Sequence, residues 1–398
     1  MVFRIQGMVN PGNEDRMRIR FCIVLCILFV IVSALPVQSA EITVTPSIGF
    51  KGEYNDNIDF SDTDRIDDYI GTLSPAVGFR YGIARFSMNS QAGGDFMFYA
   101  NDTTRNENRG RFDVDATYRP HERITFSVNG GYSRDSTLES LLEETGIVEQ
   151  RSDRDTYRVG GGLSCRTGET SSLTLSYDFS RDTYELLEFT DSEEQSIALS
   201  YQYGLNSGRD ILTVSASCGL NDSDRSVTDN YGFSVGLNRQ ISETLRASVS
   251  AGVRYTVIDS VSRESEEDWG WTANVALGKS WQRVETDLGY SRDLDFSAEG
   301  ETVEVNRFFL TVTAMLTRKL DLQCSGSLYH TTTVGAGRER DTRYLEIAPS
   351  LLYRLTQNHF LKVLYAYSHQ NEKTLGRDRT VDRNRVLLIL NFNFPMRL

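Results

Sequence analysis

The sequence predicts an all-β transmembrane protein, an antiparallel up-and-down β-barrel of about 18 strands. From residue 41 to the C-terminus, segments of about ten residues alternate apolar and polar side chains, as in Ser-Leu-Thr-Leu-Ser-Tyr-Asp-Phe-Ser at residues 172–180. Short turns and longer polar loops separate these segments in alternation, and a signal-like segment precedes them. Because strand side chains alternate with a period of two, each segment has one apolar and one polar face.

Composition agrees with a barrel and excludes other classes. The 398 residues are 39% hydrophobic, and the mean hydropathy of −0.37 is too low for a bundle of membrane-spanning helices. A barrel can span lipid with such values because every second residue faces water. Seven prolines, 31 glycines, 19 tyrosines and 20 phenylalanines suit sheets with aromatic girdles. The net charge of −13 argues against nucleic-acid binding.

Residues 1–40 are predicted to be a signal peptide. A basic segment that begins at Met17 precedes an apolar run from Phe21 to Val32, and small residues follow. This order of basic, apolar and cleavage regions is typical of secretory signals. We expect translation to start at Met17 and cleavage to fall near Ser39 and Ala40, which leaves residues 41–398 as the barrel.

The strands are expected in an order that gives short periplasmic turns and long extracellular loops. An even number of strands places both ends of the barrel in the periplasm, and the predicted location is the outer membrane of a Gram-negative bacterium. The expected strands are 42–55, 69–80, 84–99, 109–119, 123–134, 155–166, 171–183, 195–205, 210–221, 230–240, 243–258, 268–280, 282–293, 305–318, 321–333, 343–356, 359–370 and 384–394.

The polar face of these strands carries many charges, with arginine prominent. Charges cannot be buried unpaired at low cost, so they must face water or one another. One interpretation is a set of ion-pair ladders that stiffen the wall. The other is a lumen that selects solutes, with arginine favouring anionic or sugar-like ones. The predicted lumen-lining residues are Arg80, Arg111, Asp113, Asp115, Arg158, Arg246, Arg254, Arg283, Glu285, Arg307, Arg354 and Arg385.

The loop from Asp135 to Arg154 is the best candidate for a constriction. It carries five apolar residues that could anchor it inside the barrel, namely Leu138, Leu141, Leu142, Ile147 and Val148. A loop that covers the extracellular rim instead is an equal alternative.

Motifs for catalysis or cofactor binding are not visible in the sequence. It shows no nucleotide loop, zinc motif or nucleophile elbow. We therefore expect no enzymatic activity, no cofactor and no metal. A hydrolase at the barrel rim would need a histidine positioned by a carboxylate, and His330 or His369 beside a loop aspartate is the only candidate arrangement.

The start of the barrel resembles a known family. Residues 45–58 contain a proline-bearing strand, then Tyr54, and then Asp56 and Asn57 where the first loop opens. This pattern resembles the outer-membrane β-barrel porins found beside exopolysaccharide and exosortase (PEP-CTERM) gene clusters. The resemblance implies a role in passing polysaccharide or small solutes across the outer membrane. Asp56 and Asn57 also suit a turn without any ligand.

The last strand predicts how the protein enters the membrane. Barrel-assembly machinery recognises a final strand that closes on an aromatic residue, and Phe394 fits this role, with a short periplasmic tail after it. The expected partners are outer-membrane lipid and lipopolysaccharide, this machinery, and polysaccharide export components, with no nucleic acid.

Three functions follow from these observations. The leading hypothesis is a porin-like channel that exports exopolysaccharide or passes small hydrophilic solutes. The second is a structural or interaction barrel with a closed lumen that presents acidic surface loops. The third is the rim hydrolase.

Overall fold

The structure is a computed structural model, which describes residues 40–398 except 148–149, 207–208, 261–263, 336–339 and 375. Residues 1–39 of the predicted signal peptide lie outside the described residues, and Glu41 begins the first strand.

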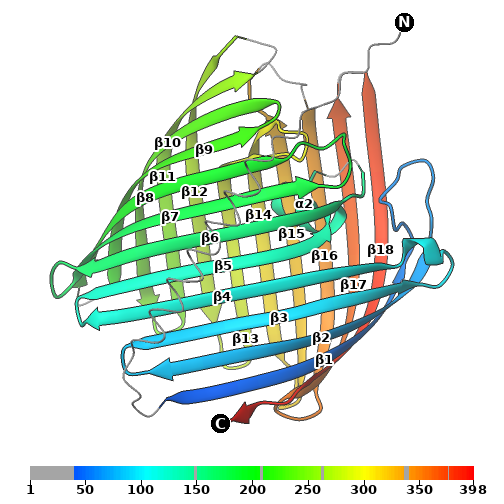
Figure 1. Ribbon diagram of the computed structural model, residues 1–398, viewed down its shortest axis with the longest axis horizontal. Coiled ribbons are helices and arrows are strands. Elements are labelled where there is room, and N and C mark those ends of the chain that lie inside the picture. The colour runs from blue at the N-terminus through cyan, green and yellow to red at the C-terminus, as the bar shows by residue number, and fades with distance from the viewer. Residues whose placement is uncertain (1–39, 148–149, 207–208, 261–263, 336–339, 375) are drawn as a thin grey trace, which may run out of the picture. The chain divides into compact units, whose positions relative to one another are not determined.

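Residues 41–398 form one compact unit made almost entirely of strands. Figure 1 shows long strands that follow one another around the wall. The strands are β1 (Glu41–Asn55), β2 (Asp68–Ile83), β3 (Phe86–Tyr99), β4 (Glu107–His121), β5 (Ile124–Ser136), β6 (Asp153–Arg166), β7 (Ser171–Tyr184), β8 (Ser192–Leu205), β9 (Asp210–Ser223), β10 (Ser226–Ser242), β11 (Leu245–Ser260), β12 (Glu266–Ser280), β13 (Val284–Phe296), β14 (Thr302–Met315), β15 (Leu320–Thr333), β16 (Arg340–Arg354), β17 (His359–Thr374), β18 (Arg377–Asn393) and β19 (Met396–Arg397).

Each of the long strands β1 to β18 pairs antiparallel with its neighbour in sequence, and the sheet closes on itself. The closing pair is β1 with β18, in a register that runs from Ser47 opposite Asn393 to Asn55 opposite Arg385. The fold prediction is therefore confirmed: this is a closed up-and-down barrel of 18 long strands. Closure matters because lipid offers no hydrogen bonds to the free edge of a sheet.

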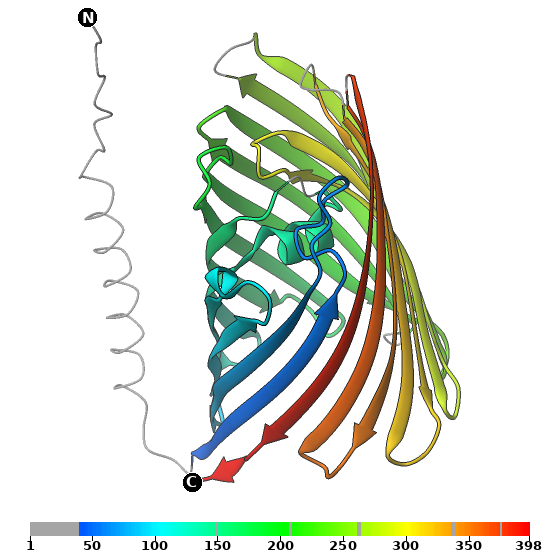
Figure 2. The same cartoon turned by 90° about the vertical axis from the view of Figure 1, so that its right-hand side faces the viewer.

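Most connections alternate in length, as the sequence predicted, but the links from β9 to β10 and from β17 to β18 are short although they lie at the loop end. At one end of the barrel, the turn end, strands are joined by links such as residues 84–85 and 122–123. At the other, the loop end, longer segments such as residues 56–67 and 185–191 intervene. Figure 2 shows the first and last strands meeting at the turn end.

The two faces of the strands differ in chemistry. On β7, Leu173, Leu175 and Tyr177 are exposed on the outside, while Ser172, Thr174 and Ser176 alternate with them on the lumen side. The same alternation exposes apolar side chains all around the wall, a belt suited to lipid. Its members include Phe50, Val77, Phe112, Val128, Leu199, Phe233, Val249, Val275, Leu288, Phe308, Leu328, Ile347, Val363 and Val386.

Three segments differ from the sequence-based expectation. The loop expected at residues 135–154 contains a helix, α2 (Thr137–Glu144). The loop expected at residues 371–383 is largely strand, because β17 and β18 stay paired from Thr374 opposite Arg377 downward. The expected tail after Phe394 pairs instead with β1, since Met396 lies opposite Val44. In each case contacts with other strands order the segment: packing on the inner wall orders α2, and strand pairing orders the other two.

The other helix is a single turn, η1 (Thr103–Arg105), with Asp102 as its N-cap. Among the described residues, no helix is long and apolar enough to cross a membrane.

The assignment of faces can be tested with a pair of adjacent substitutions on β7. Leu175→Arg places a charge on the outer belt, so we expect a loss of about 2–4 kcal/mol in the free energy of unfolding in lipid bilayers. Ser176→Arg places the same charge in the aqueous lumen and should change stability by less than about 1 kcal/mol. Denaturant unfolding of both variants in lipid vesicles measures this. Equal losses for the two would contradict the assignment.

Candidate functional site: a constriction inside the barrel

The helix α2 lies inside the barrel and packs against its inner wall (Figure 2). Leu138, Leu141 and Leu142 are buried in one apolar cluster with Tyr329 of β15 and Tyr344 of β16. Figure 2 also shows that the segment does not rest on the rim. The prediction that this segment is anchored inside is confirmed.

Other segments complete the apolar cluster. Ile147 follows the helix and joins the cluster as predicted, whereas Val148 lies outside the described residues. Phe60 enters from the loop between β1 and β2, and the rings of Phe60 and Tyr344 meet edge to face with centroids 6.4 Å apart. The cluster is a small hydrophobic core within an otherwise polar lumen.

Hydrogen bonds fix the end of α2 to the same wall. The Tyr329 hydroxyl donates to the Glu143 carbonyl at 2.7 Å, and the Gln370 amide of β17 donates to the Gly146 carbonyl at 3.0 Å. Gly146 has a φ of 72°, and a Cβ there would lie 2.9 Å from the Cβ of Tyr329. Both the backbone conformation and the close approach therefore require glycine.

Charged side chains hold α2 to strands β4 and β6. Glu139 pairs with Arg109 of β4 at 2.6 Å, and Glu144 pairs with Arg154 of β6 at 2.8 Å. The Arg154 side chain is only 2% exposed and also reaches Asp135. The segment from residue 137 to 147, named here the strut, thus contacts β4 and β6 through charges and β15 to β17 through apolar and hydrogen-bonding groups.

The electrostatic setting of Glu139 favours its charged form. Burial opposes ionisation, but the positive charges of Arg109, Lys51 and Arg385 outweigh it and lower the pKa of Glu139 to about 2. At neutral pH the carboxylate is therefore ionised and holds its arginine partner.

A cavity of about 700 Å³ lies against the strut. Its lining combines acids of the strut with arginines of the wall, and Glu143, Arg158 and Arg307 all contribute to it. Burial and the negative charges of Glu346 and Glu139 raise the pKa of Glu143. The strut thus leaves an open space lined by both signs of charge.

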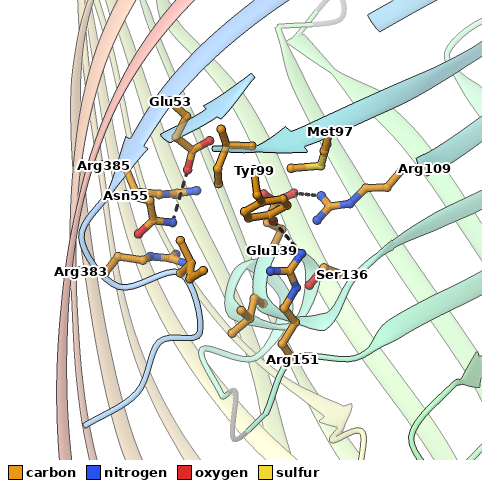
Figure 3. Close-up of a pocket in the computed structure, with 13 residues that line it drawn as sticks. Glu53, Asn55, Met97, Tyr99, Arg109, Ser136, Glu139, Arg151, Arg383 and Arg385 are labelled. Atoms are coloured by element: carbon orange, nitrogen blue, oxygen red, sulfur yellow. Dashed lines mark hydrogen bonds and ion pairs between the residues drawn. The ribbon is translucent and has the colours of Figure 1, made fainter. Parts of the chain in front are cut away.

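A much smaller cavity lies on the other side of the strut, between β1, β3, β4 and β18. Its volume is about 20 Å³. Figure 3 shows Arg109, Arg383 and Arg385 converging on it. We call it the arginine cavity.

The predicted lumen residues occupy different positions along the wall. Arg158, Arg307 and Arg385 lie at the constriction, where Arg385 pairs with Glu346 at 3.6 Å. Arg111, Asp113 and Asp115 alternate with the outward Phe112 on β4 and are exposed on the lumen side. Arg283 lies in the turn before β13 and is not part of a strand.

The remaining predicted residues make local pairs, as the ion-pair interpretation expects. Arg80 of β2 donates to Asn89 at 2.9 Å. Arg246 pairs with Asp287 at 2.8 Å and with Glu285 at 3.8 Å. Arg354 pairs with Asp321 at the turn end, and the buried Arg254 lies 3.6 Å from Asp268 and 3.8 Å from Glu304. The ion-pair interpretation therefore holds for Arg246, Arg254 and Arg354, whereas a lumen that selects solutes stays a prediction.

Sequence reasoning missed four arginines of the constriction: Arg109, Arg151, Arg154 and Arg383. Three of them lie just beyond the expected strand limits, and Arg109 begins an expected strand. Each sits at the loop end, where strand and loop could not be separated from the sequence. The period-two pattern, extended by a few residues, would have placed Arg109, Arg154 and Arg383 on the lumen face.

The residues of the family-like motif close the barrel. Asp56 accepts two hydrogen bonds from Asn384 of β18, both at 2.7 Å. Asn57 is fully buried and donates to the carbonyls of Ser61 and Asp382. Tyr54 lies beside Tyr69, with ring centroids 5.0 Å apart. This motif joins the first loop to the last strand.

The two histidines considered for hydrolysis lie on the outer face. His330 is 3.3 Å from Asp341, and His369 is 2.7 Å from Asp382. They alternate with residues that face the strut, such as Tyr329, and so point away from it. Within the described ranges, no group of three or more His, Cys, Asp or Glu side chains could hold a metal ion.

The role of Glu139 predicts a pH dependence. Its pKa lies below the ordinary 4.5, so its stabilising effect is complete above about pH 5 and is lost as pH falls toward 2. We expect Glu139→Gln to cost about 1 kcal/mol at pH 6, less than the full shift implies because the side chain is partly hydrated. At pH 2, where about half of the Glu139 side chains are protonated, the difference should fall to a small fraction of its value at pH 6. Unfolding in vesicles across this range measures the difference, with Glu169→Gln in an exposed turn as control. A difference as large at pH 2 as at pH 6 would refute the assignment.

Comparisons with known proteins agree with this architecture. The family model described as "Putative beta-barrel porin 2" matches residues 41–217, which span β1 to β8 and part of β9. No curated protein matches the chain in sequence. The match supports the β-barrel porin part of the resemblance, while the gene-cluster association stays a prediction.

Solved porin structures share the fold. OccK2 (OpdF) of Pseudomonas aeruginosa is 13% identical with a TM-score of 0.51, covering 90% of this chain and 98% of its own. A BenF-like porin of Pseudomonas fluorescens Pf-5 is 10% identical with a TM-score of 0.50, covering 90% and 99%. At such identities the likeness shows the fold alone. The chain therefore has a porin-like channel fold, which indicates the outer membrane of a Gram-negative bacterium.

Proposed function

We propose that this barrel is a passive channel for small hydrophilic solutes, with the strut as its constriction. The single observation that carries the proposal is the strut itself, tied to two parts of the wall beside a cavity of about 700 Å³. A segment fixed in this way narrows the lumen and sets which solutes pass.

The charges at the constriction favour solutes that carry a carboxylate and several hydroxyls. Arg158 and Arg307 line the large cavity, and neither has a carboxylate within ion-pair distance among the described residues. Free guanidinium groups bind carboxylates well. Glu143 and the serines of β15 in the same cavity can accept hydrogen bonds from hydroxyls. Sugar acids combine both kinds of group.

The structural relatives offer a parallel. OccK2 has also been solved in complex with glucuronate, and that chain superposes on this one with a TM-score of 0.50 at 13% identity. The parallel supports the choice of sugar acids as the first solutes to test.

Export of an exopolysaccharide chain is a second, finer proposal, favoured by the motif at Tyr54, Asp56 and Asn57. A polymer would need the strut to leave the lumen, because its apolar residues and ion pairs occupy the path. Blockade of the ionic current by polysaccharide fragments, in a variant without the strut but not in the wild type, would support this route.

The selectivity of the constriction can be measured in planar bilayers. We expect the double variant Arg158→Ala and Arg307→Ala to lower the anion-to-cation permeability ratio about two- to fivefold, the effect of losing roughly 0.5–1 kcal/mol of attraction. Lys279→Ala removes a charge from the outer face and serves as control. An unchanged reversal potential in the double variant would contradict the proposed site.

The strut can be tested by replacement. A Gly-Ser linker of equal length in place of residues 138–146 removes the three leucine anchors and both ion pairs, so single-channel conductance should rise. The absence of current from folded wild-type protein, together with current from this variant, would favour the closed structural barrel over the open channel. Equal conductance of the two would show that the strut does not limit passage.

A further inference from the structure

The arginine cavity carries a feature that solute passage does not explain. It lies between β1 and β18, where the barrel closes, and the first turn of α2 (Figure 3). Four arginines line it, Arg109, Arg151, Arg383 and Arg385, together with the acids Glu53 and Glu139. Its volume of about 20 Å³ is enough for one particle of the size of a water molecule.

Three of the arginines have nearby acids. Arg109 pairs with Glu139 at 2.6 Å and also with Glu107, which in turn holds Arg151 at 2.7 Å. Arg385 lies 3.6 Å from Glu346. Each of these arginines therefore has at least one carboxylate close by.

Arg383 has no such partner. No carboxylate of the described residues lies within ion-pair distance of it, and Glu53, the remaining acid, pairs with Lys51 at 3.3 Å. Counted over only the lining residues and the ion-pair partners just named, there are five cationic side chains and four anionic ones. Within this set, Arg383 is the cation without a carboxylate partner.

This charge is deeply buried. Arg383 is 3% exposed, and its guanidinium lies 4.9 Å from the ring centroid of Phe60, which offers no negative ion. The Nε atoms of Arg383, Arg385 and Arg109 are all buried without a hydrogen-bond acceptor. Buried polar groups in proteins are nearly always paired, and buried charges are nearly always balanced. Three arginines that line one cavity thus each have a buried Nε–H group without an acceptor, which points to an occupant.

We propose that the arginine cavity binds one monoatomic, monovalent anion of the chloride class. Such an ion neutralises Arg383 and accepts hydrogen bonds from the arginines around it. Phosphate and carboxylate groups are larger than the cavity, and a water molecule supplies no charge. Ile58, Ile70, Met97 and Leu138 form the apolar part of the lining and suit a weakly hydrated ion, and Asn55, Tyr99 and Ser136 add polar groups. The site lies beside the solute path and ties the strut to the closing strands.

Chloride bound in this cavity should stabilise the folded barrel. Purified protein in detergent should melt about 2–4 °C higher in sodium chloride than in sodium gluconate of equal ionic strength, with a saturating dependence on chloride. Arg383→Met keeps the apolar stem and removes the charge, so its Tm should no longer depend on chloride. Arg80→Met, a lumen arginine of β2 far from the cavity, is the matched control and should retain the dependence.

Diffraction from crystals grown in sodium bromide gives a second readout that does not depend on any variant folding. An anomalous peak within hydrogen-bonding distance of Arg383 is the expected result. Equal Tm values in chloride and gluconate for the wild type, a chloride dependence that survives in Arg383→Met, or the lack of a bromide peak in the cavity would each overturn the proposal. None of these outcomes depends on whether solutes pass the constriction.

Discussion

The pairing of β1 with β18 is the constraint on which the rest of the structure depends. A sheet in lipid has no water to satisfy a free edge, so its backbone groups must be paired all the way around. The register from Ser47 opposite Asn393 to Asn55 opposite Arg385 achieves this. Once the sheet closes, the period of two sends most apolar side chains of the strands to the lipid and most polar ones to the lumen. Any selective chemistry of the wall must then lie inside.

Polar side chains line most of the lumen, and the strut adds an apolar segment that enters it from the loop between β5 and β6. Leu138, Leu141 and Leu142 bring a small apolar core into the barrel, where Tyr329 and Tyr344 receive it. The ion pairs of the strut on its other side resist its withdrawal. The hydrophobic effect and charge pairing therefore act together on this segment.

Asp56 and Asn57, which directly follow β1, stabilise the closed barrel. Asp56 and Asn57 bind β18 across the closing seam, through Asn384 and the carbonyl of Asp382. A pattern that resembles a porin family therefore stabilises closure and orders the first loop, from which Phe60 reaches the apolar cluster. The same seam places Arg383 and Arg385 beside the strut. The residues that join β1 to β18 and the residues beside the strut therefore lie together at the loop end.

The sequence by itself determined the fold class, the number of strands, the alternation of turns and loops, and the two faces of the wall. These features depend on local periodicity, which residues such as Leu173 to Phe179 display directly. It also pointed to four of the anchoring residues of the strut, Leu138, Leu141, Leu142 and Ile147, because apolar side chains in a polar loop need an apolar surface to pack against, although it left open whether the loop covers the rim instead. The sequence could not reveal that this loop forms a helix, since its eight helical residues are ordered by packing on distant strands.

Only the tertiary structure decided which charges meet. Arg109 and Glu139 are 30 residues apart, and Arg383 is separated from Phe60 by more than 300. Barrel closure and the inward turn of the strut bring such pairs together, and no local pattern encodes either contact. For the same reason the sequence could not divide the lumen charges into those that pair along the wall, such as Arg246, and those left free at the constriction, such as Arg158. That division depends on distances across the lumen, which the closed barrel alone sets.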